Sequence, residues 1–211
     1  LFDIDGTLIR SGGAGKRSFN KAFRDMFGIE NAFDNVQMHG MLDPVIFSNA
    51  LSLYGILPDN HFQDFRKRYI EYLLKETEDI SGWKVVEGVI NFLEKYREKA
   101  YFALLTGNIF EGAKIKLEAM NLWRFFPEAE IGAYGDDALE RVYLGEIALN
   151  KIKKSKGIEF AVQDIIVFGD TKHDIAVAKH IGARSVALSS GGISLEELSR
   201  YQPDYLAENY L

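Results

Sequence analysis

The sequence predicts an α/β protein, a doubly wound and mostly parallel sheet with an all-helical segment inserted after its first strand. From residue 83 onward, short apolar runs typical of buried strands alternate with longer stretches of helical periodicity. This alternation is typical of a parallel sheet covered by helices on both faces. Residues 12–82 instead show helical spacing without a strand pattern. We therefore expect residues 1–11 and 83–211 to form the α/β core, and residues 12–82 to form a helical cap.

The inserted segment is expected to hold three helices. The first follows the flexible connector Ser11–Gly15 and stops at Gly28, since glycine suits the end of a helix. The second begins at Asp43, a predicted N-cap, and ends at Gly55. The third is expected to start near Asp59. Its inward face would carry Phe62, Phe65, Tyr69, Tyr72 and Leu73, an aromatic stripe that we assign to the core of the cap.

The core is expected to alternate strand and helix to the end of the chain. After the strand at the start, the predicted strands are residues 101–105, 165–168, 184–188 and 204–206, with a short one at 129–131. The predicted helices are residues 87–99, 109–120, 144–156 and 174–181. Because the sequence opens inside a strand, we expect a few residues to precede Leu1 in the complete protein.

Charge and composition exclude several classes of function. The 211 residues carry a net charge of -6 without a basic stripe, which argues against nucleic-acid binding. No apolar run approaches the ~18 residues of a membrane span. The chain has no cysteine, which excludes disulfides and thiolate metal sites and suits a cytoplasmic protein. The sequence does not distinguish a monomer from a homodimer.

Polar residues follow three of the predicted strands at the point where each strand ends. Asp3 and Asp5 leave the first strand on the same side, because side chains alternate along a strand. Thr106-Gly107-Asn108 follows the strand at 101–105, and Asp170 follows the strand at 165–168, with Asp174 one helical turn later. Ligands of such folds bind at the carboxyl ends of the strands, so we expect these groups to share one site.

The residue types at this edge suit phosphoryl chemistry with Mg²⁺. Neighbouring carboxylates repel one another unless a cation relieves them, and hard cations prefer oxygen ligands. Thr106 and the backbone N–H groups of Gly107 and Asn108, at a helix N-terminus, suit phosphate oxygens. Asp3 can attack phosphorus to form an aspartyl-phosphate, while Asp5 can protonate the leaving oxygen and then activate water.

The segments Asp3–Leu8, Leu104–Asn108 and Gly169–Asp174 resemble motifs one, two and four of the haloacid dehalogenase-like hydrolase superfamily. The resemblance covers the whole chain, including a helical cap after the first motif, and implies a Rossmann-like core. It implies that Asp3 is the nucleophile and Asp5 the general acid/base. It also implies Mg²⁺ held by the Asp3 side chain, the Asp5 main-chain carbonyl and Asp170, with Asp174 bracing the metal site. Thr106 would hold the phosphoryl group.

In this chain, the third motif of that superfamily does not have its usual form. It commonly supplies a lysine, often followed by proline, and no Lys-Pro occurs in this chain. The segment Gly135–Arg141 occupies that position, so we assign the cation to Arg141, whose forked guanidinium suits phosphate. The alternative is a lysine of the following helix, Lys151 first among Lys151, Lys153, Lys154 and Lys156.

Within the superfamily, the chain most resembles the phosphoglycolate phosphatase-like group. Dehalogenases lack the second acid, which disfavours dehalogenation here, and β-phosphoglucomutases usually carry a histidine at the start of the cap, where Ser11–Lys16 has none. We expect hydrolysis of a small phosphorylated metabolite, with phosphoglycolate as the leading substrate. The alternatives are a phosphomutase of the β-phosphoglucomutase type and, from another class, a phospho-accepting signalling or binding protein.

Substrate choice is expected to depend on the cap, which would close over the site and exclude water. Arg17 and Asp43 lie near the two ends of this segment and are candidate substrate contacts. The ordinary alternatives are an exposed helix start for Arg17 and an N-cap for Asp43.

Overall fold

The structure is a computed structural model that describes residues 1–58 and 61–211. Three strands form a parallel sheet in the order β3 (Ile166–Gly169), β4 (Arg184–Leu188) and β5 (Tyr205–Ala207). Val167 pairs with Ser185, and Ala187 with Leu206. The chain start extends this sheet, because Phe2 forms parallel bridges to both Phe168 and Leu104. The predicted parallel α/β arrangement is therefore confirmed.

The far edge of the sheet differs from the prediction. Residues 129–131 are not a strand but a 3-10 helix, η2 (Ala129–Ile131), because the N–H of Gly132 donates back to the carbonyl of Ala129. The bridge to Leu105 forms two residues beyond that helix, at Ala133. In the expected strand at 101–105, the bridges lie at Leu104 and Leu105.

Helices cover both faces of the sheet, and the alternation of side chains along each strand explains why. Phe2, Leu104 and Phe168 belong to one large apolar cluster together with Leu93 of α4 (Val89–Tyr96) and Leu117 of α5 (Phe110–Ala119). On the other face, Leu105 packs with Ala148 of α6 (Leu144–Lys156) and Val177 of α7 (Lys172–Ile181). Both faces are buried, as a parallel sheet requires.

The remaining core elements are short. They are the 3-10 helices η1 (Trp123–Phe125), η3 (Arg141–Tyr143), η4 (Val162–Asp164) and η5 (Ser189–Gly191), and the helix α8 (Leu195–Ser199).

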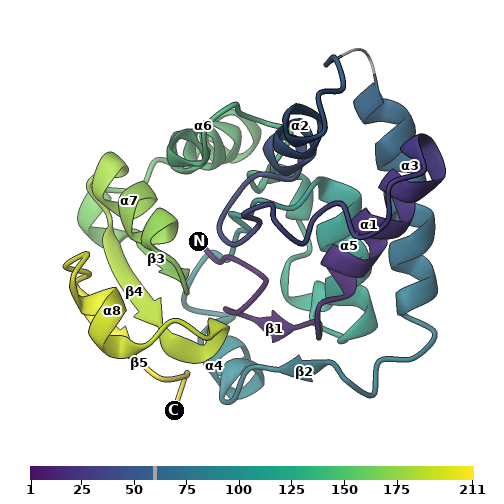
Figure 1. Ribbon diagram of the computed structural model, residues 1–211. Coiled ribbons are helices and arrows are strands. Elements are labelled where there is room, and N and C mark those ends of the chain that lie inside the picture. The colour runs from purple at the N-terminus through teal and green to yellow at the C-terminus, as the bar shows by residue number, and fades with distance from the viewer. Residues whose placement is uncertain (59–60) are drawn as a thin grey trace.

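The inserted segment consists of α1 (Ala14–Phe27), α2 (Asp43–Leu53) and α3 (His61–Glu76), as expected from the helical spacing. It is joined to the core by a two-stranded antiparallel pair, β1 (Ile9–Arg10) and β2 (Lys84–Val85). The N-terminal segment runs through the middle of the molecule, with α1 and α3 on one side and α7 and β4 on the other (Figure 1). The expected start of α3 at Asp59 lies outside the described residues.

Aromatic rings hold these three helices together. The rings of Phe47 from α2 and Phe65 from α3 stack with centroids 4.2 Å apart, and Phe19 of α1 packs edge-on against Phe65. Phe65 and Tyr69 are fully buried in this cluster. Tyr72 is more exposed, and its hydroxyl donates to Asp25 of α1. Among the described residues, no helix combines the length and apolarity needed to cross a membrane.

Two helix starts differ from the sequence prediction. Helix α2 begins at Asp43 itself with Leu42 as its N-cap, so the expected capping role of Asp43 is wrong. Its carboxylate accepts a hydrogen bond from a loop of the core instead. Helix α7 begins two residues before Asp174, with Thr171 as its N-cap.

Candidate active site

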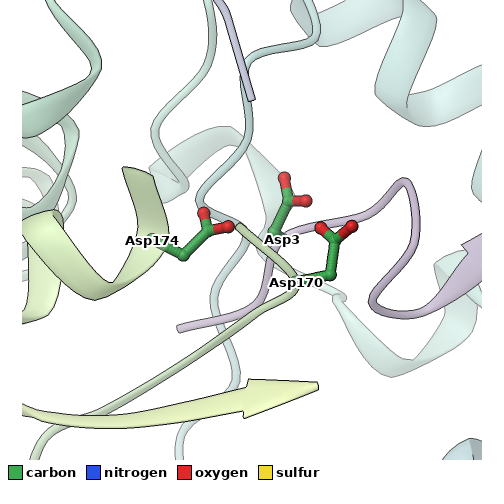
Figure 2. A group of neighbouring side chains, drawn as sticks. All are labelled: Asp3, Asp170 and Asp174. Atoms are coloured by element: carbon green, nitrogen blue, oxygen red, sulfur yellow. The ribbon is translucent and has the colours of Figure 1, made fainter. Parts of the chain in front are cut away.

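Three carboxylates meet where the central strands end. Figure 2 shows Asp3 from the N-terminal segment, Asp170 from the loop after β3, and Asp174 from the first turn of α7, turned toward a common space. One oxygen of each carboxylate lies within 4.8 Å of the others, and all three residues are buried. Three segments distant in sequence therefore meet at this edge, as the strand-end pattern predicts.

This group of oxygens fits a magnesium ion. Carboxylates are the ligands that hard cations prefer, and Asp170 Oδ1 is buried without a hydrogen-bond partner among the described residues. Burial raises the pKa of Asp3 to about 7, and the charges of the neighbouring carboxylates act in the same direction, while the charge of Arg141 opposes them. A cation between these oxygens would remove the repulsion.

The carboxylate of Asp170 fits its surroundings because two neighbouring residues, Gly6 and Gly191, are glycines and have no side chain. A β-carbon on Gly191 would lie 1.6 Å from Asp170 Oδ2, and one on Gly6 would lie 2.3 Å from the same atom. The loop between α1 and α2 also reaches this acid, since His39 Nε2 lies 2.9 Å from Asp170 Oδ2. That hydrogen bond raises the pKa of His39.

Arg141 is the buried cation beside this group. Its Nη2 lies 2.9 Å from Asp3 Oδ1 and 2.6 Å from Asp174 Oδ1. Those carboxylates raise the pKa of Arg141 further, although burial opposes them, so the guanidinium stays charged. Its Nε is buried and unpartnered among the described residues. The alternative cation, Lys151, lies elsewhere and donates to Asp137 and to the carbonyl of Gly132.

Asp174 is held from both ends. Its Oδ1 meets Arg141, while its Oδ2 accepts hydrogen bonds from the hydroxyl and the backbone N–H of Thr171, at 2.7 and 3.1 Å. The Thr171 hydroxyl in turn accepts from the N–H of His173, which completes a capping box at the start of α7. The carboxylate that was expected to brace the metal site is thus itself fixed by the helix start.

Asp5 has surroundings unlike those of Asp3. Its side chain is 41% exposed, and its Oδ2 accepts from Lys116 Nζ at 2.6 Å and Asn108 Nδ2 at 2.8 Å. Partial burial acts to raise the pKa of Asp5, but the charge of Lys116 and the hydrogen bonds from Lys116, Asn108 and Ser11 lower it. The two acids of the first motif therefore have pKa values shifted in opposite directions.

Lys116 is the residue that the sequence reasoning missed. It lies on the inward face of α5, is only 4% exposed, and also donates to Asn108 Oδ1 at 2.7 Å. Its position follows Ala113 by three residues and Ile109 by seven, and both of these are buried. A lysine on the apolar face of a helix that begins at a functional strand end was the available signal.

The two cap residues singled out from the sequence behave differently. Asp43 is buried, and its Oδ2 accepts from the backbone N–H of Ile109 at 2.9 Å, while its own N–H donates to the carbonyl of Gly107 at 2.8 Å. Arg17 donates instead to Glu76 of α3 and to the carbonyl of Gly12. Asp43 lines a cavity beside the acidic group, and Arg17 is not among the residues that line it.

A cavity of about 460 Å³ opens between the acidic group and the inserted helices. The helices contribute Phe19, Ile46 and Tyr69 to its wall. The core contributes Asp3, Asp5 and Asp170, together with the segment 106–108 that is predicted to bind phosphate. The cations that line the cavity are Arg10, Lys16, Lys116 and Arg141. Its size suits a small molecule.

Comparisons with known proteins agree with this description. The sequence model of the haloacid dehalogenase-like hydrolase family matches residues 1–188. A phosphoglycolate phosphatase of Aliivibrio fischeri is 27% identical over 215 residues, which cover 99% of this chain and 91% of that protein. Pyrophosphatase PpaX of Listeria monocytogenes is 23% identical over 99% of this chain and 90% of its own length. The crystal structure of a hydrolase from Pseudomonas syringae superposes with a TM-score of 0.74 at 20% identity, over 100% of this chain and 93% of that one.

Proposed function

The chain belongs to the haloacid dehalogenase-like hydrolase family, and from that premise we propose that it is a Mg²⁺-dependent phosphatase that hydrolyses a small phosphorylated metabolite through an aspartyl-phosphate. Phosphatase activity itself agrees with the names of its relatives. The observation that supports the Mg²⁺ requirement and the aspartyl-phosphate route is the buried group of Asp3, Asp170 and Asp174, with Arg141 beside it. A fixed cation next to a nucleophilic carboxylate is what phosphoryl transfer requires.

In the proposed reaction, a carboxylate oxygen of Asp3 attacks phosphorus and the bond to the leaving oxygen breaks. Bound Mg²⁺ would be held by Asp3, the main-chain carbonyl of Asp5 and Asp170, and would offset charge on the phosphoryl oxygens. Arg141, 2.9 Å from Asp3, neutralises charge on the same group. Thr106 donates to a phosphoryl oxygen.

Asp5 moves the protons. In the free site, Lys116 keeps the carboxylate of Asp5 ionised. An arriving phosphoryl group raises the pKa of Asp5 by like-charge repulsion, so that Asp5 takes up a proton. That proton passes to the leaving oxygen. Asp5 then removes a proton from water, whose oxygen attacks phosphorus, and cleavage of the aspartyl-phosphate restores Asp3 and releases inorganic phosphate.

The proposed substrate is small and anionic, and phosphoglycolate is the first compound to test. The cavity of about 460 Å³ supports this, since Arg10 and Lys16 are among the cations that line it. The phosphoglycolate phosphatase among the relatives supports it as well.

The decisive test is release of phosphate from p-nitrophenyl phosphate and from a panel of small phosphorylated metabolites, with Mg²⁺ and with EDTA. We expect turnover that requires Mg²⁺ and that the Asp3→Asn substitution abolishes. Mg²⁺-dependent hydrolysis by the Asp3→Asn protein would refute the aspartyl-phosphate route. A phosphomutase would instead return an isomeric phosphoester with little free phosphate.

A further inference from the structure

Thr106 has a hydroxyl that can only donate to a ligand. A threonine hydroxyl has one hydrogen and two lone pairs. Both lone pairs face Asn108, whose Nδ2 lies 2.9 Å and whose backbone N lies 3.3 Å from Thr106 Oγ1. Among the described residues, none accepts the hydroxyl hydrogen, and Thr106 lines the cavity while being fully buried. The hydrogen is therefore available to an acceptor in the cavity.

The direction of this hydrogen depends on which way the Asn108 amide faces. Reversal of the amide would turn Oδ1 toward Thr106, which would then spend its hydrogen on Asn108. Lys116 opposes that reversal, because its ammonium has donors only and lies 2.7 Å from Asn108 Oδ1. Asp5 opposes it from the other side, because its Oδ2 accepts from Asn108 Nδ2 at 2.8 Å and from Lys116 Nζ, and reversal would set the oxygen of the amide against that acceptor.

Lys116 is an unusual residue for the buried face of α5. Burial of an ammonium is costly unless it is paired and hydrogen-bonded, and an apolar side chain would suit this face of α5 better. Both of its described partners, Asp5 and Asn108, line the same cavity as Thr106. The N-terminal turn of α1 closes over the ammonium, since a β-carbon on Gly15 would lie 3.5 Å from Lys116 Nζ.

We infer that Lys116 is a positioning residue, which fixes the Asn108 amide so that Thr106 presents its hydrogen to a phosphoryl oxygen, and which at the same time holds the carboxylate of Asp5. The inference rests on the proposed function, because it assumes that the cavity receives a phosphoryl group. Lys116 acts through Asn108 and Asp5 and need not touch the substrate. Arg141 pairs with other carboxylates of the site, those of Asp3 and Asp174.

A double-mutant cycle separates this role from a simple charge effect. Affinity for inorganic phosphate is measured calorimetrically with Mg²⁺ present, for the wild type, Lys116→Met, Thr106→Val and the double variant. Loss of a donor to a charged group predicts about 10- to 100-fold weaker phosphate binding for Thr106→Val, and about tenfold for Lys116→Met. Because both changes remove the same hydrogen bond, the double variant is expected to bind within about twofold of Thr106→Val.

Several outcomes overturn the inference. Lys116→Met overturns it if it binds phosphate like the wild type, or if it adds its full effect in the Thr106→Val background, as a direct charge contact would. Lys116→Gln keeps a donor for Asn108 Oδ1 without the charge, and is expected to bind phosphate better than Lys116→Met. If Lys116→Gln and Lys116→Met weaken phosphate binding equally, the charge of Lys116 alone explains the effect, and the positioning role is refuted.

Two controls make the result readable. Lys114 lies on the same helix but is exposed and paired with Glu118, so Lys114→Met is expected to bind phosphate like the wild type. If Lys116→Met does not fold, as thermal melting would show, the cycle is run with Asn108→Ala, which removes the amide, and the same non-additivity is required. Wild-type turnover of p-nitrophenyl phosphate tests the proposed function separately, since phosphate affinities can be compared even without turnover.

Discussion

The carboxylate of Asp43 accepts the backbone N–H of Ile109, 2.9 Å away across 66 residues of sequence. Asp43 is the first residue of α2 in the inserted segment, and Ile109 precedes α5 in the core. The N–H of Asp43 also donates to the carbonyl of Gly107. One residue of the inserted helices therefore fastens the loop that follows Thr106, the loop proposed to bind phosphate.

Replacement of Asp43 by alanine is expected to loosen that loop. The Ile109 N–H would be left buried without its partner, which costs about 1–3 kcal/mol of unfolding free energy. We expect a higher KM for phosphate esters together with a lower melting temperature. Asp43→Asn retains an oxygen acceptor and is expected to recover most of both. A KM unchanged in Asp43→Ala would show that the bond does not position the loop.

Arg141 is expected to be far more important for turnover than Lys151. Loss of a preorganised donor at the site of charge development typically costs about 10²- to 10³-fold in kcat, and we expect Arg141→Met to fall in that range. Lys151→Met removes the hydrogen bonds to Asp137 and Gly132. Like most substitutions away from the site, it is expected to change kcat by less than about twofold. Comparable losses in the two variants would contradict the assignment of the cation.

Stability without Mg²⁺ is expected to fall as the pH rises. The pKa values of both Asp3 and Asp43 are raised to about 7 by burial, above their values in the unfolded chain. Between about pH 4 and pH 7 the folded protein thus binds more protons than the unfolded one, so the free energy of unfolding decreases with pH. Melting curves from pH 5 to pH 8 in EDTA check this.

Addition of Mg²⁺ is expected to reduce that slope, because a cation favours the ionised form of Asp3. The Asp3→Asn protein is expected to lose the part due to Asp3, to keep the part due to Asp43, and to lose the response to Mg²⁺. Melting temperatures that rise with pH in EDTA would contradict the assignment of raised pKa values to these two acids.

Gly191 is expected to be necessary for metal binding although it carries no ligand. A β-carbon there would lie 1.6 Å from Asp170 Oδ2, so Gly191→Ala must displace the carboxylate or the loop. We expect weaker Mg²⁺ binding by calorimetry, with proportionate loss of activity at low Mg²⁺. Gly82 is the matched control, since a β-carbon on it meets nothing within 4 Å. Equal Mg²⁺ affinities in the two alanine variants would refute the steric argument.

Much of this arrangement could be predicted from local sequence. Apolar runs ending in Asp3, Thr106 and Asp170 predicted strands that deliver polar groups to one edge, and the structure brings those groups together. The helical spacing of residues 12–82 predicted α1 to α3. The predicted strand at 129–131 was wrong. Hydrogen bonds from i+3 to i form a 3-10 helix there, and the bridge to Leu105 forms later, at Ala133.

What the sequence by itself determined is the order of elements and the kinds of side chain at the strand ends, because periodicity and turn residues act over a few positions. The tertiary structure alone decided which cation stands beside Asp3 and what Asp43 binds. It also decided that Lys116, 111 residues from Asp5, lies 2.6 Å from that carboxylate. These contacts depend on how α5, η3 and the inserted helices approach the sheet, and burial then makes each pairing obligatory, since an unpaired charge there would be too costly.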